Sequence, residues 1–96
     1  MLLAFELDRH ENQTRPMYED VIRMAELQTR NLEKGGEVVE VELTDDDEVR
    51  VRDKSFRPSD GVRVQVVVDG DGYCVRGWNQ HGDSTRWRCG DGESTP

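Results

Sequence analysis

Residues 62–78 read VRVQVVVDGDGYCVRGW, and they carry the clearest strand pattern in the chain. Side chains alternate between the two faces of a strand, so every second valine of the first half lies on one side. The Asp-Gly pairs at 69–72 supply the positive φ that tight hairpin turns require. The stretch therefore predicts two antiparallel strands, 62–68 and 72–78, joined by a tight turn. The valines on the shared side are Val62, Val64, Val66 and Val68.

The segments on either side of this hairpin also contain short strand patterns. EVVEVEL at 37–43 and VRVRD at 49–53 alternate with a period of two and are separated by the acidic TDDDE. This arrangement predicts a second hairpin over residues 37–52. STRWR at 84–88 is expected to form the last strand, so that the sheet extends over about residues 37–89.

A helix is predicted upstream of the strands, over about residues 16–34. Thr14 is suited to the N-cap position, and Pro16 is suited to the first helical turn. Gly35 and Gly36 are expected to end the helix, because glycine adopts the left-handed conformation found after helix C-termini. Apolar residues recur at the spacing of a helix, so that they gather on one face of it. Its residues are Met17, Val21, Met24, Ala25 and Leu32, with Tyr18 and Ile22 at the margin.

One helix followed by a series of hairpins is typical of an α+β fold, in which the helix packs on an antiparallel sheet of about four to five strands. The chain has 96 residues, so residues 1–96 are assigned to a single domain. Residues 1–14 fit an extended segment and the tail of a longer helix equally well. The small polar residues of GDGESTP, at 90–96, predict a frayed C-terminal tail.

Composition and charge narrow the classes of function. Apolar residues make up 33% of the chain, so the core is expected to be thin and a deep, enclosed active site is not expected. The net charge is −8, which argues against nucleic acid as a partner because phosphate backbones require a positive surface. No stretch approaches the about 20 apolar residues of a membrane helix. No serine–histidine motif or phosphate-binding loop is present, so neither an enzyme nor a cofactor is predicted.

The two cysteines bracket a predicted hairpin. If its turn is centred between His81 and Gly82, the residue numbers of cross-strand partners sum to 163, which places Cys74 opposite Cys89. Opposed Cβ atoms in a sheet lie ~4.5–5.5 Å apart, close to the separation that a disulfide needs. Two free thiols and a metal site remain the alternatives, although zinc would need four ligands and only His81 lies nearby in sequence. A persistent disulfide would indicate an oxidising compartment.

The same register makes further predictions about this hairpin. It places Arg76 opposite Trp87, where a cation–π contact is possible, and Trp78 opposite Thr85. A bulge at Gly82 would shift the register by one residue. Arg76, Trp78 and Trp87 are the residues that we expect to contact other molecules.

Two acidic turns are weak candidates for calcium binding, because calcium prefers carboxylate and carbonyl oxygens. The candidate residues are Asp45 and Asp47 in one turn and Asp69 and Asp71 in the other. Hairpin turns use Asp and Gly for backbone reasons alone. The spacing of an EF-hand loop is absent, so no metal is predicted.

Short motifs between Phe56 and Gly92 resemble the C-terminal region of type IV pilin-like (prepilin-type) proteins, particularly those of actinobacteria. The resemblance implies the C-terminal half of a long helix laid on an antiparallel sheet, with the end of the subunit pinned by a disulfide. The leader, processing site and apolar anchor helix of that family are absent from this sequence. The matching residues are Phe56, Pro58, Ser59, Gly61, Val62 and Val64, then Gly72, Tyr73, Cys74 and Val75, then Thr85, Trp87 and the GDG end.

The resemblance implies a structural or interaction protein, the globular part of a pilin-like subunit at the cell surface or outside the cell. Its partners would be other pilin-like subunits, joined through an N-terminal helix that this sequence lacks, so the chain in isolation is expected to be monomeric. The alternative is a small acidic cytoplasmic binding module, such as an immunity or regulatory protein. That alternative would keep both cysteines reduced and use its acidic face to meet a basic partner.

Overall fold

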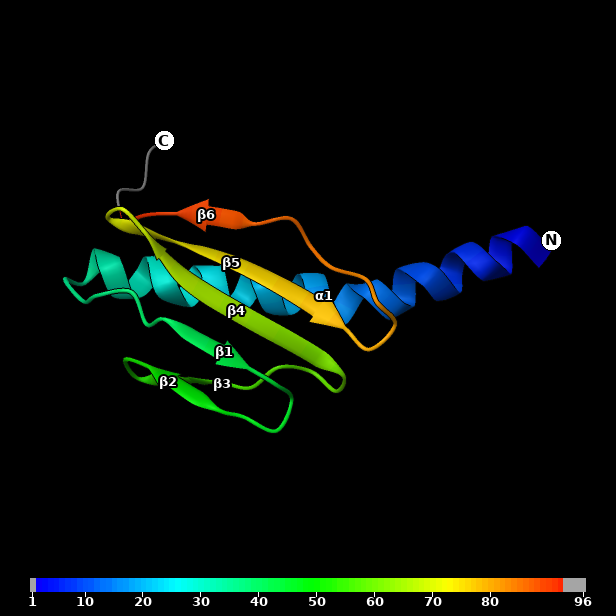
Figure 1. The fold of residues 1–96 in the computed structure, drawn as a ribbon, viewed down its shortest axis with the longest axis horizontal. Coiled ribbons are helices and arrows are strands. Elements are labelled where there is room, and N and C mark those ends of the chain that lie inside the picture. The colour runs from blue at the N-terminus through cyan, green and yellow to red at the C-terminus, as the bar shows by residue number, and fades with distance from the viewer. Residues whose placement is uncertain (1, 93–96) are drawn as a thin grey trace.

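The computed structural model describes the backbone of residues 2–92 and the side chains of residues 13–92. One helix packs on a four-stranded antiparallel sheet of order β1–β4–β5–β6, and a two-stranded sheet of β2 and β3 lies beside it (Figure 1). The predicted α+β fold is confirmed. The elements are α1 (Leu2–Glu33), β1 (Val41–Leu43), β2 (Val49–Val51), β3 (Lys54–Phe56), β4 (Val62–Asp69), β5 (Gly72–Asn79) and β6 (Arg88–Gly90).

The hairpin of β4 and β5 forms the centre of the sheet, as the sequence predicts. Its two strands pair over their whole length, from Val62 opposite Asn79 to Asp69 opposite Gly72. Gly70 has a φ of 60° in the turn, a conformation that favours glycine. The hairpin therefore fixes which face of the sheet meets the helix.

The predicted hairpin over residues 37–52 is wrong. β1 pairs with β4, with Val41 opposite Val66, whereas β2 pairs with β3, with Val49 opposite Phe56. Pairing with β4 places the buried side chain of Leu43 beside Val64 in the core. Because the alternation along a strand does not specify its partner, the acidic turn between β1 and β2 suggested a pairing that the fold does not use.

The helix begins at Leu2 instead of residue 16, so Pro16 lies inside it and Thr14 is not its N-cap. A proline in a helix lacks the N–H that would bond to the carbonyl four residues earlier, which explains why it suggested a first turn. Of the two interpretations of residues 1–14, the longer helix is correct for the backbone from Leu2 onward. The helix ends at Glu33, and Gly35 has a φ of 84°.

The final strand is shorter than STRWR predicts. β6 contains only Arg88–Gly90, so most of the predicted strand 84–88 lies outside regular sheet structure. Gly90 belongs to this strand instead of the predicted frayed tail. Of the rest of that tail, residues 91 and 92 lie outside the strands and residues 93–96 lie outside the described residues.

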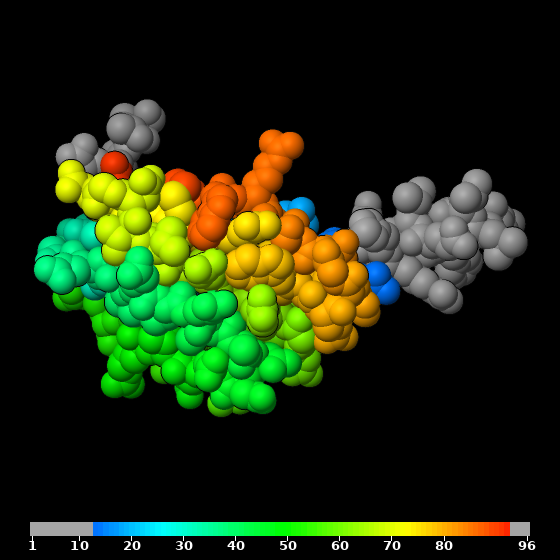
Figure 2. Space-filling view, in the orientation of Figure 1, coloured from blue at the N-terminus to red at the C-terminus, as the bar shows by residue number. Residues whose placement is uncertain are grey.

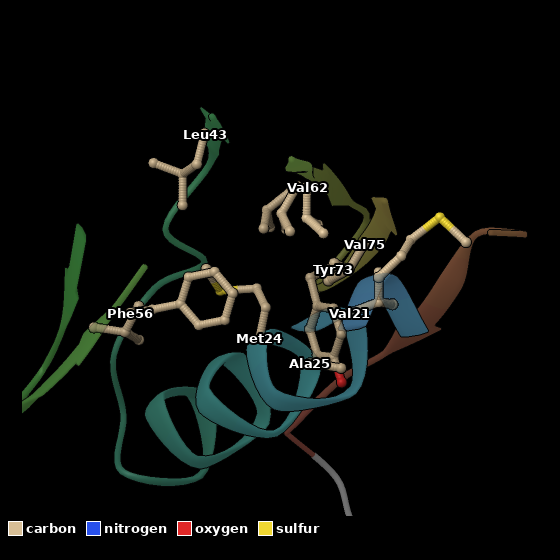
Figure 3. Packing of buried hydrophobic residues seen from close by; sticks show 12 residues of the cluster. Val21, Met24, Ala25, Leu43, Phe56, Val62, Tyr73 and Val75 are labelled. Carbon is tan, nitrogen blue, oxygen red and sulfur yellow. The ribbon is translucent and has the colours of Figure 1, made fainter. Parts of the chain in front are cut away.

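The core lies between α1 and the sheet (Figure 3). Met24 and Ala25 on the helix face Tyr73 and Val75 on β5, and Phe56 of the small sheet closes one side (Figure 3). Four of the five residues predicted for the apolar helix face are buried, and Leu32 is partly buried against the same cluster. The buried apolar residues are Met17, Val21, Met24, Ala25, Leu43, Val51, Phe56, Val62, Val64, Val66, Tyr73, Cys74 and Val75.

Buried polar side chains of α1 join the helix to the segments beside the sheet. The amide of Gln28, which is fully buried, donates to the carbonyl of Val39 at 3.0 Å and accepts from the N–H of Val39 at 2.9 Å. The buried carboxylate of Asp20 accepts from the N–H of Ser59 at 2.7 Å and from its hydroxyl at 3.1 Å. These bonds fix the helix relative to the residues before β1 and β4.

Gly77 allows the helix to approach the sheet closely. A Cβ at this position would lie 2.8 Å from Cγ2 of Val21 and 3.3 Å from Cγ of Met17. We expect Gly77→Ala to lower the free energy of unfolding by about 1–3 kcal/mol, because crowding in a packed core forces side chains and backbone to shift. The measurement is urea unfolding followed by circular dichroism. The double variant Gly77→Ala with Val21→Ala should lose less unfolding free energy than the sum of the losses in the two single variants. Losses that add fully would contradict this packing.

Candidate interaction surface

A disulfide joins β5 to β6. Cys74 and Cys89 lie directly opposite each other in the sheet and are bonded. This confirms the predicted pairing. The described residues contain no free cysteine, so the alternatives of two thiols and of a zinc–thiolate site are both wrong. The carboxylate of Asp69 approaches both sulfur atoms, but sulfurs in a disulfide offer no thiolate to a metal.

The face of the sheet that points away from α1 carries alternating arginine and tryptophan side chains. Two guanidinium groups lie over the ring of Trp78, that of Arg63 at 5.3 Å and that of Arg76 at 4.9 Å from the ring centroid. The guanidinium of Arg76 also lies 5.8 Å from the ring of Trp87, which confirms the predicted cation–π contact. The three residues predicted to form the interaction surface are therefore brought together. Arg63 is the member that sequence reasoning missed.

The register changes by one residue between the disulfide and the turn. Trp78 forms its bridge with Ser84 instead of the predicted Thr85. Thr85 points inward and is buried, where its N–H donates to the carbonyl of Gly77 at 2.9 Å and its hydroxyl accepts from the N–H of Gly77 at 3.1 Å. Gly82 has a φ of 90° in this turn, at the position where a shift was predicted to arise.

An open groove lies between α1 and the segment before β6. It has a volume of about 330 Å³. Tyr18 and Ile22 on the helix are 49% and 39% exposed, and Trp87 across the groove is 44% exposed. The sequence placed Tyr18 and Ile22 at the margin of the core, and the structure leaves both of them accessible. The groove is lined by Tyr18, Val21, Ile22, Thr85, Arg86, Trp87 and Arg88.

The four aspartates that were weak candidates for calcium belong to two separate turns. A carboxylate oxygen of Asp45 accepts from the N–H of Gly61 at 2.6 Å, and one of Asp47 accepts from the N–H of Thr44 at 2.8 Å. Within the part of the chain that the structure describes, no three carboxylates converge on one point. The first turn therefore uses its carboxylates to hold the backbone.

The backbone and side-chain hydrogen bonds from Thr44 lower the pKa of Asp47 below the ordinary value of an aspartate. A folded-state pKa below the unfolded one means that this interaction stabilises the fold above the unfolded pKa and is lost as pH falls through the folded pKa. An NMR titration should therefore find the Asp47 midpoint below that of an unstructured peptide. Thr44→Val removes the hydroxyl and should raise the midpoint, and an unchanged midpoint would contradict this assignment.

Among the described residues, no helix has the length and apolar character needed to cross a membrane. Comparisons of the chain with protein families, curated proteins and solved structures find no match.

Proposed function

We propose that this chain is the globular part of a pilin-like subunit of a surface filament or secretion apparatus. The proposal rests on the length of α1 and on its position relative to the sheet. The helix packs on the sheet from Met17 onward, and its N-terminal part continues past the end of the sheet (Figure 1). A long helix whose C-terminal half lies on an antiparallel sheet is the arrangement that the sequence resemblance implies.

The disulfide supports the same proposal. It ties the last strand, which has only three residues, to the long central strand β5. Disulfides persist in oxidising compartments and are rare in the cytosol. An extracellular or cell-surface location is therefore proposed in preference to the cytoplasmic binding module, which would keep both cysteines reduced.

The proposed role is to build an assembly and to present a contact surface on it. An apolar N-terminal helix outside this sequence would carry the subunit into an assembly, while the sheet presents its outer face to the surroundings. On that face the stack of Arg63, Trp78, Arg76 and Trp87 forms the contact surface that we propose. The isolated chain is proposed to be monomeric at micromolar concentration.

The location of the natural protein tests the proposal. Cells are sheared to release surface filaments, and the sheared, membrane and cytoplasmic fractions are probed with an antibody against this chain. The proposal predicts the protein in the sheared or membrane fraction, with about 20 apolar residues encoded upstream of Met1. Recovery in the cytoplasmic fraction alone would contradict it and favour the acidic binding module.

A further inference from the structure

The groove between α1 and residues 85–88 combines exposed apolar side chains with positive charge. Tyr18, Ile22 and Trp87 supply the apolar surface. Arg86 and Arg88 line the same groove, and neither is paired with a carboxylate of the described residues. In a chain with a net charge of −8, this combination predicts a partner that is acidic and carries an apolar side chain.

The β4–β5 turn has the complementary character. Val68 is 51% exposed at the end of β4, and the exposed Asp69 and Asp71 follow it. A second depression, of about 410 Å³, lies beside this turn, and Val68, Asp71 and Glu37 are among the residues that line it. The turn therefore presents one apolar side chain among carboxylates.

The two surfaces occupy different parts of the molecule. Their lining residues do not overlap. In Figure 2 the yellow turn lies at the left end of the molecule, while the orange segment before β6 lies nearer the middle of the upper edge. One copy can therefore use both surfaces at the same time.

We infer that the β4–β5 turn of one copy docks into the groove of a second copy, with Val68 against the apolar side chains and the two aspartates near Arg86 and Arg88. The same chain supplies both the acidic and the basic member of the pair, which is why the partner is a second copy. Contacts between two different surfaces are heterologous, and they generate rings or open filaments instead of closed dimers.

This contact is small, so it is weak for the isolated domain. The inference rests on the proposed function in one respect, because assembly through the N-terminal helix outside this sequence would hold neighbouring domains together. Tethering raises the effective concentration of two surfaces to the millimolar range, where a weak contact becomes occupied. The isolated domain thus stays monomeric at micromolar concentration and begins to associate at millimolar concentration.

The direct test is an NMR comparison of the isotope-labelled domain at micromolar and millimolar concentrations. The amide signals of the groove, residues 18–22 and 85–88, should shift as the concentration rises. The amide signals of the turn, residues 68–71, should shift together with them. Added salt should reduce the shifts, because exposed charges are screened. Shifts at neither group, or at only one of them, would overturn the inference.

Charge reversal makes the test specific. R86E/R88E gives an acidic groove and D69K/D71K gives a basic turn, and all four side chains are exposed, so the fold should be retained. Each variant alone should lose the concentration-dependent shifts. Mixing the two should restore them, because each groove then meets a turn of opposite charge.

A matched control separates this contact from a general effect of net charge. R50E/R57E changes the charge by the same amount at exposed positions outside both surfaces, and it should keep the shifts. Loss of the shifts in this control, or no recovery in the mixture, would overturn the inference. Either result would leave the proposed function standing, since that proposal is tested by the location of the protein in the cell.

Discussion

Replacing Cys74 and Cys89 by serine together is expected to lower the free energy of unfolding by about 2–4 kcal/mol. The bond links residues 15 apart in sequence and restricts the unfolded chain, so its removal gives the unfolded state more freedom. Urea and thermal unfolding, followed by circular dichroism, measure the loss. The helix signal should persist at low temperature, because neither cysteine belongs to the hydrophobic cluster that packs α1 against the sheet.

Reductant provides the control for this prediction. A reducing agent should destabilise the native protein by a similar amount and leave the double-serine variant unchanged. If the native protein and the double-serine variant unfold at the same urea concentration, the disulfide does not support the fold as described.

Asp20→Asn is expected to lower the free energy of unfolding by about 2–3 kcal/mol. Its buried carboxylate accepts two hydrogen bonds from Ser59 and one from Arg23 at 2.7 Å. An amide of the same shape has one acceptor oxygen and would turn its NH₂ toward a donor. The N–H of Ser59 or the guanidinium of Arg23 would then lose its acceptor inside the protein, depending on which way the amide is turned.

The neighbouring residue supplies the matched control for Asp20. Glu19→Gln makes the same chemical change on an exposed side chain and should alter the stability by less than about 0.5 kcal/mol. Equal effects of the two changes would contradict the proposed tie between α1 and the loop before β4.

The central hairpin could be predicted from the sequence because its signals are local. Valine alternation defines the buried face of β4, and Asp-Gly pairs define the turn to β5. The partner of β1 could not be predicted in this way. Its pairing with β4 joins residues far apart in the chain, and it is decided by burial of Leu43 against the core.

The start of the helix was missed because Thr14 and Pro16 have the residue types of a helix N-terminus. Nothing within one turn of them distinguishes a true start from a proline accommodated in a longer helix. The structure shows the second case, with α1 running from Leu2.

The candidate surface was predicted in part. Residue numbers alone predicted the bond between Cys74 and Cys89 and the contact between Arg76 and Trp87. Both depend only on the register of one hairpin. The groove was not predicted. Tyr18 and Ile22 fall at the edge of the apolar helix face, and their exposure depends on where the segment before β6 leaves the sheet.

The oxidation state of the two cysteines in the living cell tests the extracytoplasmic role most directly. Intact cells are treated with a membrane-permeant thiol reagent before lysis. The protein is then isolated, and its intact mass is measured by mass spectrometry. An oxidised subunit predicts an unlabelled chain, two hydrogen atoms lighter than its reduced form, that takes up two labels only after reduction. Two labels without reductant would show that Cys74 and Cys89 are reduced in the cell. That result would contradict both the disulfide and the proposed location outside the cytoplasm.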